Sequence, residues 1–166
     1  MGLFKMIVPK PEPILAWRTE AGLAGDFEFD FDRHALCGIR PGDPVSLLWK
    51  LGPSEDKQVE ECFNYYSRGV QAEAENGVVA SFILFWNDKE QRKFLAFSGR
   101  CIYRGETIGL RAGMTEAEIR GVFGEPGRRD EDEGEVVLFY KFEGIEWEVE
   151  IDRREGLTAM VVLTGR

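Results

Sequence analysis

Asp30, Asp32 and His34 are the residues whose types and spacing come closest to a chemical site. They alternate along the chain, so on a β-strand their side chains would point to the same side. With Cys37 nearby, they offer oxygen, nitrogen and sulfur ligands for a divalent metal. The alternative is that Asp30 and Asp32 form the solvent side of a strand. The other side of that strand would then be formed by Phe27, Phe29 and Phe31.

A tetrahedral metal site is usually completed by a second histidine or by a close pair of cysteines. The chain has 1 histidine, and its 3 cysteines, at positions 37, 62 and 101, include no C-x-x-C pair. We therefore expect no metal and no other cofactor. A small-ligand or metal-binding protein, with hydrolase chemistry at Asp30, Asp32 and His34 as one form of it, is kept as the alternative function.

Other patterns that support catalysis are weak. His34 is the only histidine that could serve a Ser-His or Cys-His mechanism. The glycines at 121, 124 and 127 lack the G-x-G-x-x-G spacing of a dinucleotide-binding turn. Nothing selects a glycosidase pair among the 30 acidic residues. These observations favour a protein that is not an enzyme, and we predict no catalytic residue.

An acidic strand is the first of two features that suggest surface recognition. Glu146, Glu148 and Glu150 alternate with apolar residues, which predicts a strand with one apolar and one carboxylate face. Such a face could steer a basic protein partner. The alternative is a solvated face that cations on neighbouring strands neutralise. The candidate cations are Lys141, Arg153 and Arg154.

The second feature is aromatic. Adjacent aromatic pairs occur at 65–66, 85–86 and 139–140. On a strand, one member of each pair faces away from its neighbour. Tyr66 and Phe139 are therefore candidate binding residues, because aromatic side chains are enriched in binding hot spots. The alternative is that other parts of the chain bury these rings.

The chain also resembles itself. Residues 39–53 read like residues 110–126, and each segment predicts a short helix that ends at a glycine, Gly52 or Gly124. Asp43 is the predicted N-cap of the first helix, with Pro44 in its first turn. Thr115 is the predicted N-cap of the second, where Glu118 completes a capping box.

The similarity continues into strands. Residues 70–75 and 145–152 alternate between apolar and polar, and apolar strands at 78–86 and 157–163 follow turns. Further strands are expected around 27–31 and 94–102. The sequence thus predicts an α+β fold of two tandem repeats, each a short helix packed on an antiparallel β-meander. The predicted segments are 1–26 at the N-terminus, 27–96 for the first repeat and 97–166 for the second, with the repeats forming one compact unit.

The capped helices at 42–53 and 113–126, together with Tyr65 and Tyr140 on the strands that follow, resemble the helix-plus-meander units of the β-lactamase inhibitor protein. They are also similar to the small lipoprotein of the outer-membrane barrel-assembly machinery. The resemblance implies this fold and a binding role with the sheet as the platform. Both of those proteins are exported, whereas this sequence shows no export signal. The resemblance therefore implies an intracellular relative, among either the bacterial tandem-repeat proteins or the toxin-immunity proteins.

Composition narrows the classes of partner. The chain has 166 residues, a net charge of −9 and 43% hydrophobic residues, which suits a soluble globular protein. A pI near 4.8 argues against nucleic acid. No apolar run reaches the roughly 18 residues of a membrane span. The absence of a secretory signal and the few, scattered cysteines lead us to expect a cytoplasmic protein.

These observations together predict a non-enzymatic protein-binding module that acts through a sheet surface. An immunity or inhibitor-like protein would be one form of it. The expected partner is a protein, of basic character if the acidic strand takes part. The expected binding residues are Tyr66, Phe139, Glu146, Glu148 and Glu150.

Overall fold

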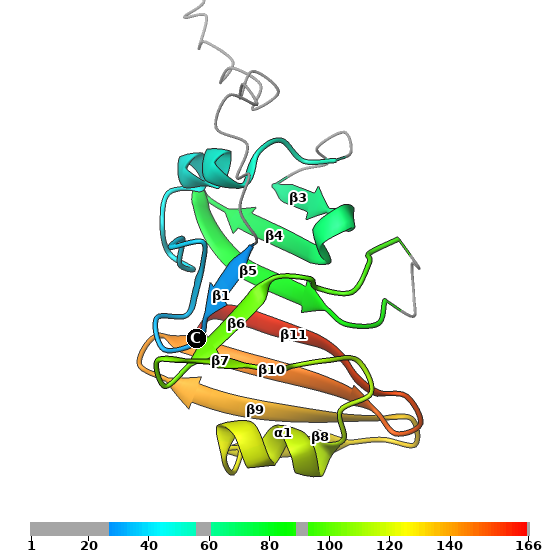
Figure 1. Ribbon diagram of the computed structural model, residues 1–166. Helices are drawn as coiled ribbons and strands as arrows, with labels where there is room; N and C mark the ends of the chain where they lie inside the picture. Colours follow the sequence, from blue (N-terminus) through cyan, green and yellow to red (C-terminus); the bar gives the residue numbers. More distant parts are fainter. Residues whose placement is uncertain (1–26, 56–60, 89–92, 166) are drawn as a thin grey trace, which may run out of the picture.

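A seven-stranded antiparallel sheet forms the larger layer of the computed structural model, which describes residues 27–55, 61–88 and 93–165. Its strand order is β3-β4-β5-β11-β10-β9-β8, so β5 and β11 lie side by side at its centre (Figure 1). The bounds are β3 Cys62–Tyr65, β4 Val70–Glu75, β5 Val78–Phe85, β8 Arg128–Glu131, β9 Glu135–Phe142, β10 Ile145–Asp152 and β11 Gly156–Thr164. The N-terminal segment 1–26 lies outside the described residues.

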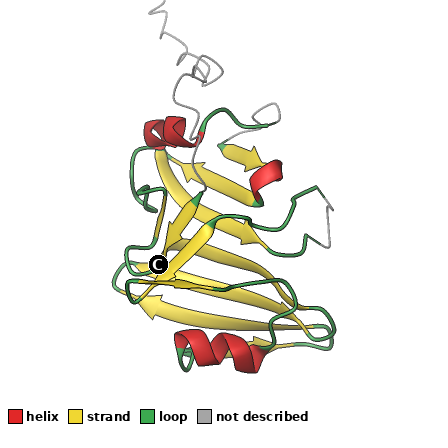
Figure 2. Cartoon of the chain, viewed as in Figure 1, coloured by secondary structure: helices red, strands yellow, loops and turns green. Residues whose placement is uncertain are grey.

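A four-stranded sheet forms the second layer. Its order is β2-β1-β6-β7, and β1 and β6 are parallel, with Phe29 opposite Cys101. The bounds are β1 Glu28–Asp30, β2 Ala35–Leu36, β6 Arg100–Tyr103 and β7 Glu106–Ile108. The protein is mostly β, with short helices η3 Val45–Leu51, η4 Tyr66–Arg68 and α1 Glu116–Phe123, consistent with the predicted α+β class (Figure 2).

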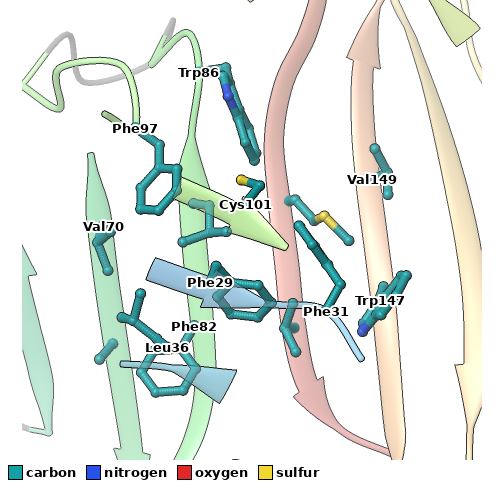
Figure 3. Close-up of a cluster of buried hydrophobic side chains, with 14 of the residues drawn as sticks. Phe29, Phe31, Leu36, Val70, Phe82, Trp86, Phe97, Cys101, Trp147 and Val149 are labelled. Atoms are coloured by element: carbon teal, nitrogen blue, oxygen red, sulfur yellow. The ribbon is translucent and has the colours of Figure 1, made fainter. Parts of the chain in front are cut away.

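The hydrophobic core lies between the two sheets. Phe29, Phe31 and Leu36 of the smaller layer are fully buried against the larger sheet (Figure 3). Phe82 and Trp147 of the larger sheet belong to the same cluster. Burial of these large side chains is the main force that holds the layers together.

Strand β10 has the predicted bounds and the predicted alternation. Ile145, Trp147, Val149 and Ile151 are buried, and the four acidic residues between them are partly exposed. A period of two is the pattern of a strand with one face on the core. Strand β4 repeats this pattern over Val70–Glu75.

Helix α1 begins as predicted. The Thr115 hydroxyl accepts a hydrogen bond from the Glu118 amide at 3.3 Å, and the Thr115 amide donates to the Glu118 carboxylate at 2.8 Å. This reciprocal pair satisfies two amides that a helix start leaves free. Ile119 and Phe123, four residues apart, are the buried side of the helix.

The first helix differs from its prediction. η3 is a 3-10 helix whose cap position is Pro44, and no side chain caps it. Asp43 is not an N-cap, because its carboxylate instead accepts from the Arg40 amide at 2.8 Å in the preceding turn. Gly52 does have the expected positive φ, 85°, but its ψ of −176° is extended rather than helical.

The strand predicted over 94–102 is shorter than expected. β6 covers only Arg100–Tyr103, and the residues before it are held at the end of the larger sheet. There the Leu95 amide donates to the Tyr66 carbonyl at 2.9 Å, and the Phe97 amide to the Phe85 carbonyl at 2.6 Å. In the described part of the chain, no helix is long and apolar enough to cross a membrane.

Candidate functional site

Asp30, Asp32 and His34 do not share a strand face, so that prediction is wrong. Strand β1 ends at Asp30, and Asp32 and His34 lie in the turn that follows. The Asp30 carboxylate accepts from the Arg33 amide at 3.1 Å. The Asp32 carboxylate accepts from the amides of Arg104 and Gly105, both at 2.9 Å. Both aspartates thus stabilise turns, which is a structural role.

His34 faces the core instead. Its Nδ1 accepts a hydrogen bond from Trp147 Nε1 at 3.1 Å, and its ring centroid lies 4.8 Å from that of Phe142. Partial burial and the positive charge of Arg40 lower the pKa of His34 below 6.5. The imidazole is therefore neutral near neutral pH, with the proton on Nε2.

Burial disfavours the thiolate form of two of the three cysteines, Cys37 and Cys101. Burial raises the pKa of Cys37, and it raises the pKa of Cys101 to about 12, whereas a metal ligand is a thiolate. Within residues 27–55, 61–88 and 93–165, no three His, Cys, Asp or Glu side chains are grouped so that they could hold a metal ion.

Phe139 and the three glutamates lie on the side of the larger sheet that faces away from the smaller one, which we call the open face. Its positions follow from the strand registers, which place Val161 between Ile83 of β5 and Glu148 of β10. The apolar positions of the open face are Ile83, Phe85, Val137, Phe139, Ala159, Val161 and Leu163. Its charged strand positions are Glu73, Arg128, Asp130, Glu135, Lys141, Glu146, Glu148, Glu150 and Asp152.

Glu146, Glu148 and Glu150 all lie on the open face, as their spacing predicts. Glu146 pairs with Lys141 of β9 at 3.1 Å. Glu148 lies between Phe139 and Val161, and partial burial together with the charge of Glu146 raises its pKa. We call Glu146, Glu148 and Glu150 the acidic row, and this row therefore lies among apolar side chains.

The cations predicted to neutralise this row do so only in part. Lys141 does pair with Glu146. Arg153, in contrast, pairs with Glu131 of β8. The Arg154 amide bonds to the Asp152 carboxylate as part of a turn.

The two aromatic candidates are covered by neighbouring side chains. Phe139 is 8% exposed, and the Arg128 guanidinium lies 3.7 Å from its ring centroid. Tyr66 begins η4 rather than lying on a strand, and its ring lies 4.7 Å from that of Phe94. Phe94 also stacks on Phe85 at 4.2 Å. These contacts give both rings a packing role in the isolated chain.

A hollow of about 360 Å³ lies on the open face at the end of β5. Its floor is apolar, made by Ile83, Phe85, Ala159 and Val161, and its other lining residues are polar or acidic. The acidic ones are Asp88, Glu135, Glu150 and Asp152.

Sequence reasoning missed this floor. The available signal was the near-continuous apolar run of β5, VVASFILF, which has apolar residues on both faces of the strand. A strand with one solvated face should instead alternate.

Comparison with known proteins gives a fold likeness. No family model matches the chain, and no curated protein matches its sequence. The crystal structure of a DUF4309 family protein, YjgB, from Bacillus subtilis is similar to it, with a TM-score of 0.53 and 11% sequence identity. The match covers 78% of this chain and 84% of that chain. At this identity, the likeness concerns the fold alone.

Proposed function

We propose that this protein is a non-enzymatic binding module that holds a protein partner on its open face. The observation that carries the proposal is the composition of that face, an apolar centre around Ile83 and Val161 bordered by the acidic row of β10. Apolar area supplies binding free energy, and the surrounding charge selects the partner and speeds its approach. A bacterial immunity or inhibitor-like protein of the cytoplasm would act in this way.

The face is better suited to a partner than the edges of the larger sheet. At one edge, the Asn64 amide of β3 donates to the Ser54 hydroxyl at 3.0 Å, and the Glu55 amide donates to the Asn64 carbonyl at 2.8 Å. At the other edge, β8 consists of four charged, exposed residues. Covered and charged edges disfavour the addition of a strand from another chain. We therefore place the partner across the face.

We also propose that the two halves of the chain are copies of one unit. Tyr65 donates its hydroxyl hydrogen to the Gly52 carbonyl at 3.3 Å, and Tyr140 does the same to Gly124 at 3.0 Å. Both glycines follow the short helix of their half. The order β3-β4-β5 and β11-β10-β9 about the centre of the sheet also supports a duplication. The duplicated unit would produce the wide sheet that the binding role needs.

Two single lysine substitutions test the binding role. Val161→Lys places a cation at the centre of the open face, whereas Thr107→Lys places one on an exposed position of β7, in the other layer. Each variant and the wild type, immobilised, would be exposed to a bacterial lysate, and the retained proteins identified by mass spectrometry. We expect the wild type and Thr107→Lys to retain the same partner, and Val161→Lys to lose it.

The comparison is made only between variants with unchanged thermal unfolding. Retention of the same proteins in equal amounts by Val161→Lys would overturn the open face as the binding surface.

A further inference from the structure

The centre of the open face is apolar and only partly covered. Phe94 stacks on Phe85 at 4.2 Å, so the segment before β6 already packs over the end of β5. Beyond this contact lie apolar side chains that are partly exposed in the described part of the chain, namely Ile83, Val137, Val161 and Leu163. An exposed apolar surface of this kind marks a place where another segment or molecule binds.

The N-terminal segment, which lies outside the described residues, has a sequence that suits this surface. Residues 3–17 include two largely apolar stretches, LFKMIV at 3–8 and ILAW at 14–17. The charged residues up to position 18 are three cations and one acid, Lys5, Lys10, Arg18 and Glu12, which gives this stretch a net charge of +2. Repulsion between like charges therefore does not keep it away from the acidic row that borders the apolar centre.

The described chain begins at a point from which this segment can reach the open face. Phe27 lies beside the edge strand β3, with its ring centroid 6.1 Å from that of Tyr65. The distance across the sheet from β3 to β11 is three strand spacings, or about 15 Å. Residues 18–26 span up to about 30 Å when extended. This length allows residues 3–17 to pass around the edge of the sheet and lie over its apolar centre.

We propose that residues 3–17 lie across the open face of the same chain and cover its apolar centre while no partner is bound. Resting on the proposed function, this cover is what the protein partner displaces when it binds. A face that is open for only a fraction of the time binds its partner more weakly by that fraction, so the segment acts as an internal competitor. Trp17 is the expected anchor of the segment, because tryptophan is enriched among the side chains that dominate binding.

Fluorine NMR of the full chain tests this contact. The chain has 4 tryptophans, Trp17, Trp49, Trp86 and Trp147. Labelling with 5-fluorotryptophan gives each of them one resonance, which is assigned by its loss in the corresponding phenylalanine variant. The change in chemical shift between H₂O and D₂O reports how far each ring is exposed to solvent. Trp49 is an exposed reference, and Trp86 and Trp147 are buried references. We expect the Trp17 resonance to behave as those of the buried pair.

Two lysine variants locate the contact. Val161→Lys lies at the centre of the open face, and Thr107→Lys lies on an exposed position of β7 in the other layer. We expect Val161→Lys to shift the Trp17 resonance to an exposed value, and Thr107→Lys to leave it unchanged. The resonances of the two buried tryptophans report the fold, and Ile83→Lys replaces Val161→Lys if that variant moves them.

Three results would overturn the contact. They are an exposed Trp17 in the wild type, equal effects of the two lysine variants, and a Trp17 resonance that shifts with protein concentration. The last of these would show that the segment of a second copy covers the face.

Two glutamate variants test the displacement. Trp17→Glu removes the expected anchor, and Thr19→Glu adds the same charge outside residues 3–17. We expect Trp17→Glu to bind the captured partner about tenfold more tightly than the wild type does, as for the loss of one anchoring side chain from a competitor. Thr19→Glu should bind as the wild type does. Equal binding by all three proteins would overturn the competition.

The outcomes separate this inference from the proposed function. If Trp17 is exposed and Val161→Lys still loses the captured partner, the open face binds that partner without an internal cover, and only this inference falls. If Trp17 lies on the face but Val161→Lys captures the same proteins as the wild type, the cover stands and the proposed function falls.

Discussion

Trp147 brings together aromatic residues from both layers and from α1. It is 1% exposed, and its ring lies 5.3 Å from Phe31 of the smaller layer and 5.3 Å from Phe123 of α1. The indole N–H in this apolar setting needs an acceptor, and His34 Nδ1 supplies it. The only histidine of the chain is thereby tied to the core rather than to a chemical site.

Partial burial of His34 makes the stability of the protein depend on pH. The pKa of His34 is lower in the folded protein than the ordinary 6.5, so the unfolded chain binds the proton more readily. The contribution of neutral His34 to the free energy of unfolding is therefore fully present above pH 6.5. It is lost as the pH falls from 6.5 towards the pKa of His34 in the folded protein. We expect the urea concentration at the midpoint of unfolding to decrease as the pH is lowered from about 7.5 to about 5.5, the interval in which histidine titrates.

A His34→Gln variant is the control for this prediction. Glutamine offers an acceptor to the indole without titrating, so the variant should show a flatter pH dependence over the same interval. Parallel curves for the two proteins would exclude His34 as the source.

At the scale of single residues, the sequence predicted acidic positions better than it predicted the candidate metal site. The spacing of Glu146, Glu148 and Glu150 was sufficient to place them on one face, because the eight residues of β10 form one regular strand in which buried and partly exposed residues alternate. The same reasoning failed at Asp32 and His34, since the backbone turns after Asp30 without a glycine or proline to mark the turn. His34 itself takes a positive φ of 54°, which side-chain periodicity does not reveal.

At the scale of elements, two glycine turns differ in what surrounds them. Gly69 follows η4 with φ 67° and ψ 37°, and a Cβ there would lie 2.4 Å from the Leu95 carbonyl oxygen. Gly144, in the turn between β9 and β10, has φ 71° but open space around the corresponding position. The first glycine allows both a left-handed turn and a close approach of the chain, and the second allows only the turn.

Alanine at each position separates the two effects. Gly144→Ala should lower the free energy of unfolding by about 1–2 kcal/mol, the cost of a left-handed residue with a Cβ. Gly69→Ala should cost about 3 kcal/mol or more, because the crossing segment near Leu95 must also move. Urea unfolding of both variants measures the difference, and equal losses would show that the crossing segment adapts freely.

Short sequence patterns correctly predicted the elements that are determined by contacts between residues close together in the sequence. The capping box of Thr115 and Glu118 is complete within four residues, and it was predicted correctly. The cap of the first helix was predicted wrongly because the Asp43 carboxylate could accept a hydrogen bond either from the helix or from the preceding turn. In the structure it accepts from the Arg40 amide of that turn. The parallel pairing of β1 with β6 joins residues far apart in sequence, so no local pattern could indicate it.

At the scale of the whole molecule, hydrogen bonding crosses between the two halves in both sheets. β5 pairs with β11 in the larger sheet, and β1 pairs with β6 in the smaller one. Unfolding of one half would therefore expose the apolar side of the other. We expect one cooperative transition, in which far-UV circular dichroism and tryptophan fluorescence coincide.

Two tryptophan variants sharpen this measurement. Trp86 belongs to the first half and Trp147 to the second, so Trp86→Phe and Trp147→Phe shift the fluorescence signal towards opposite halves. Coincident transitions within each variant are the expected result. A fluorescence transition that precedes the circular dichroism transition in one variant only would identify the halves as independent domains.

The position of β11 also bears on how the protein is made. This strand is the last of the described chain to leave the ribosome, yet it lies at the centre of the sheet, between β5 and β10. Until it emerges, the apolar edge of β5 has no partner on that side, and an unpaired strand edge is a template for aggregation. At about 5–20 residues per second, the nascent chain carries this edge for several seconds. Protection of β5 during synthesis is therefore a requirement of this strand order.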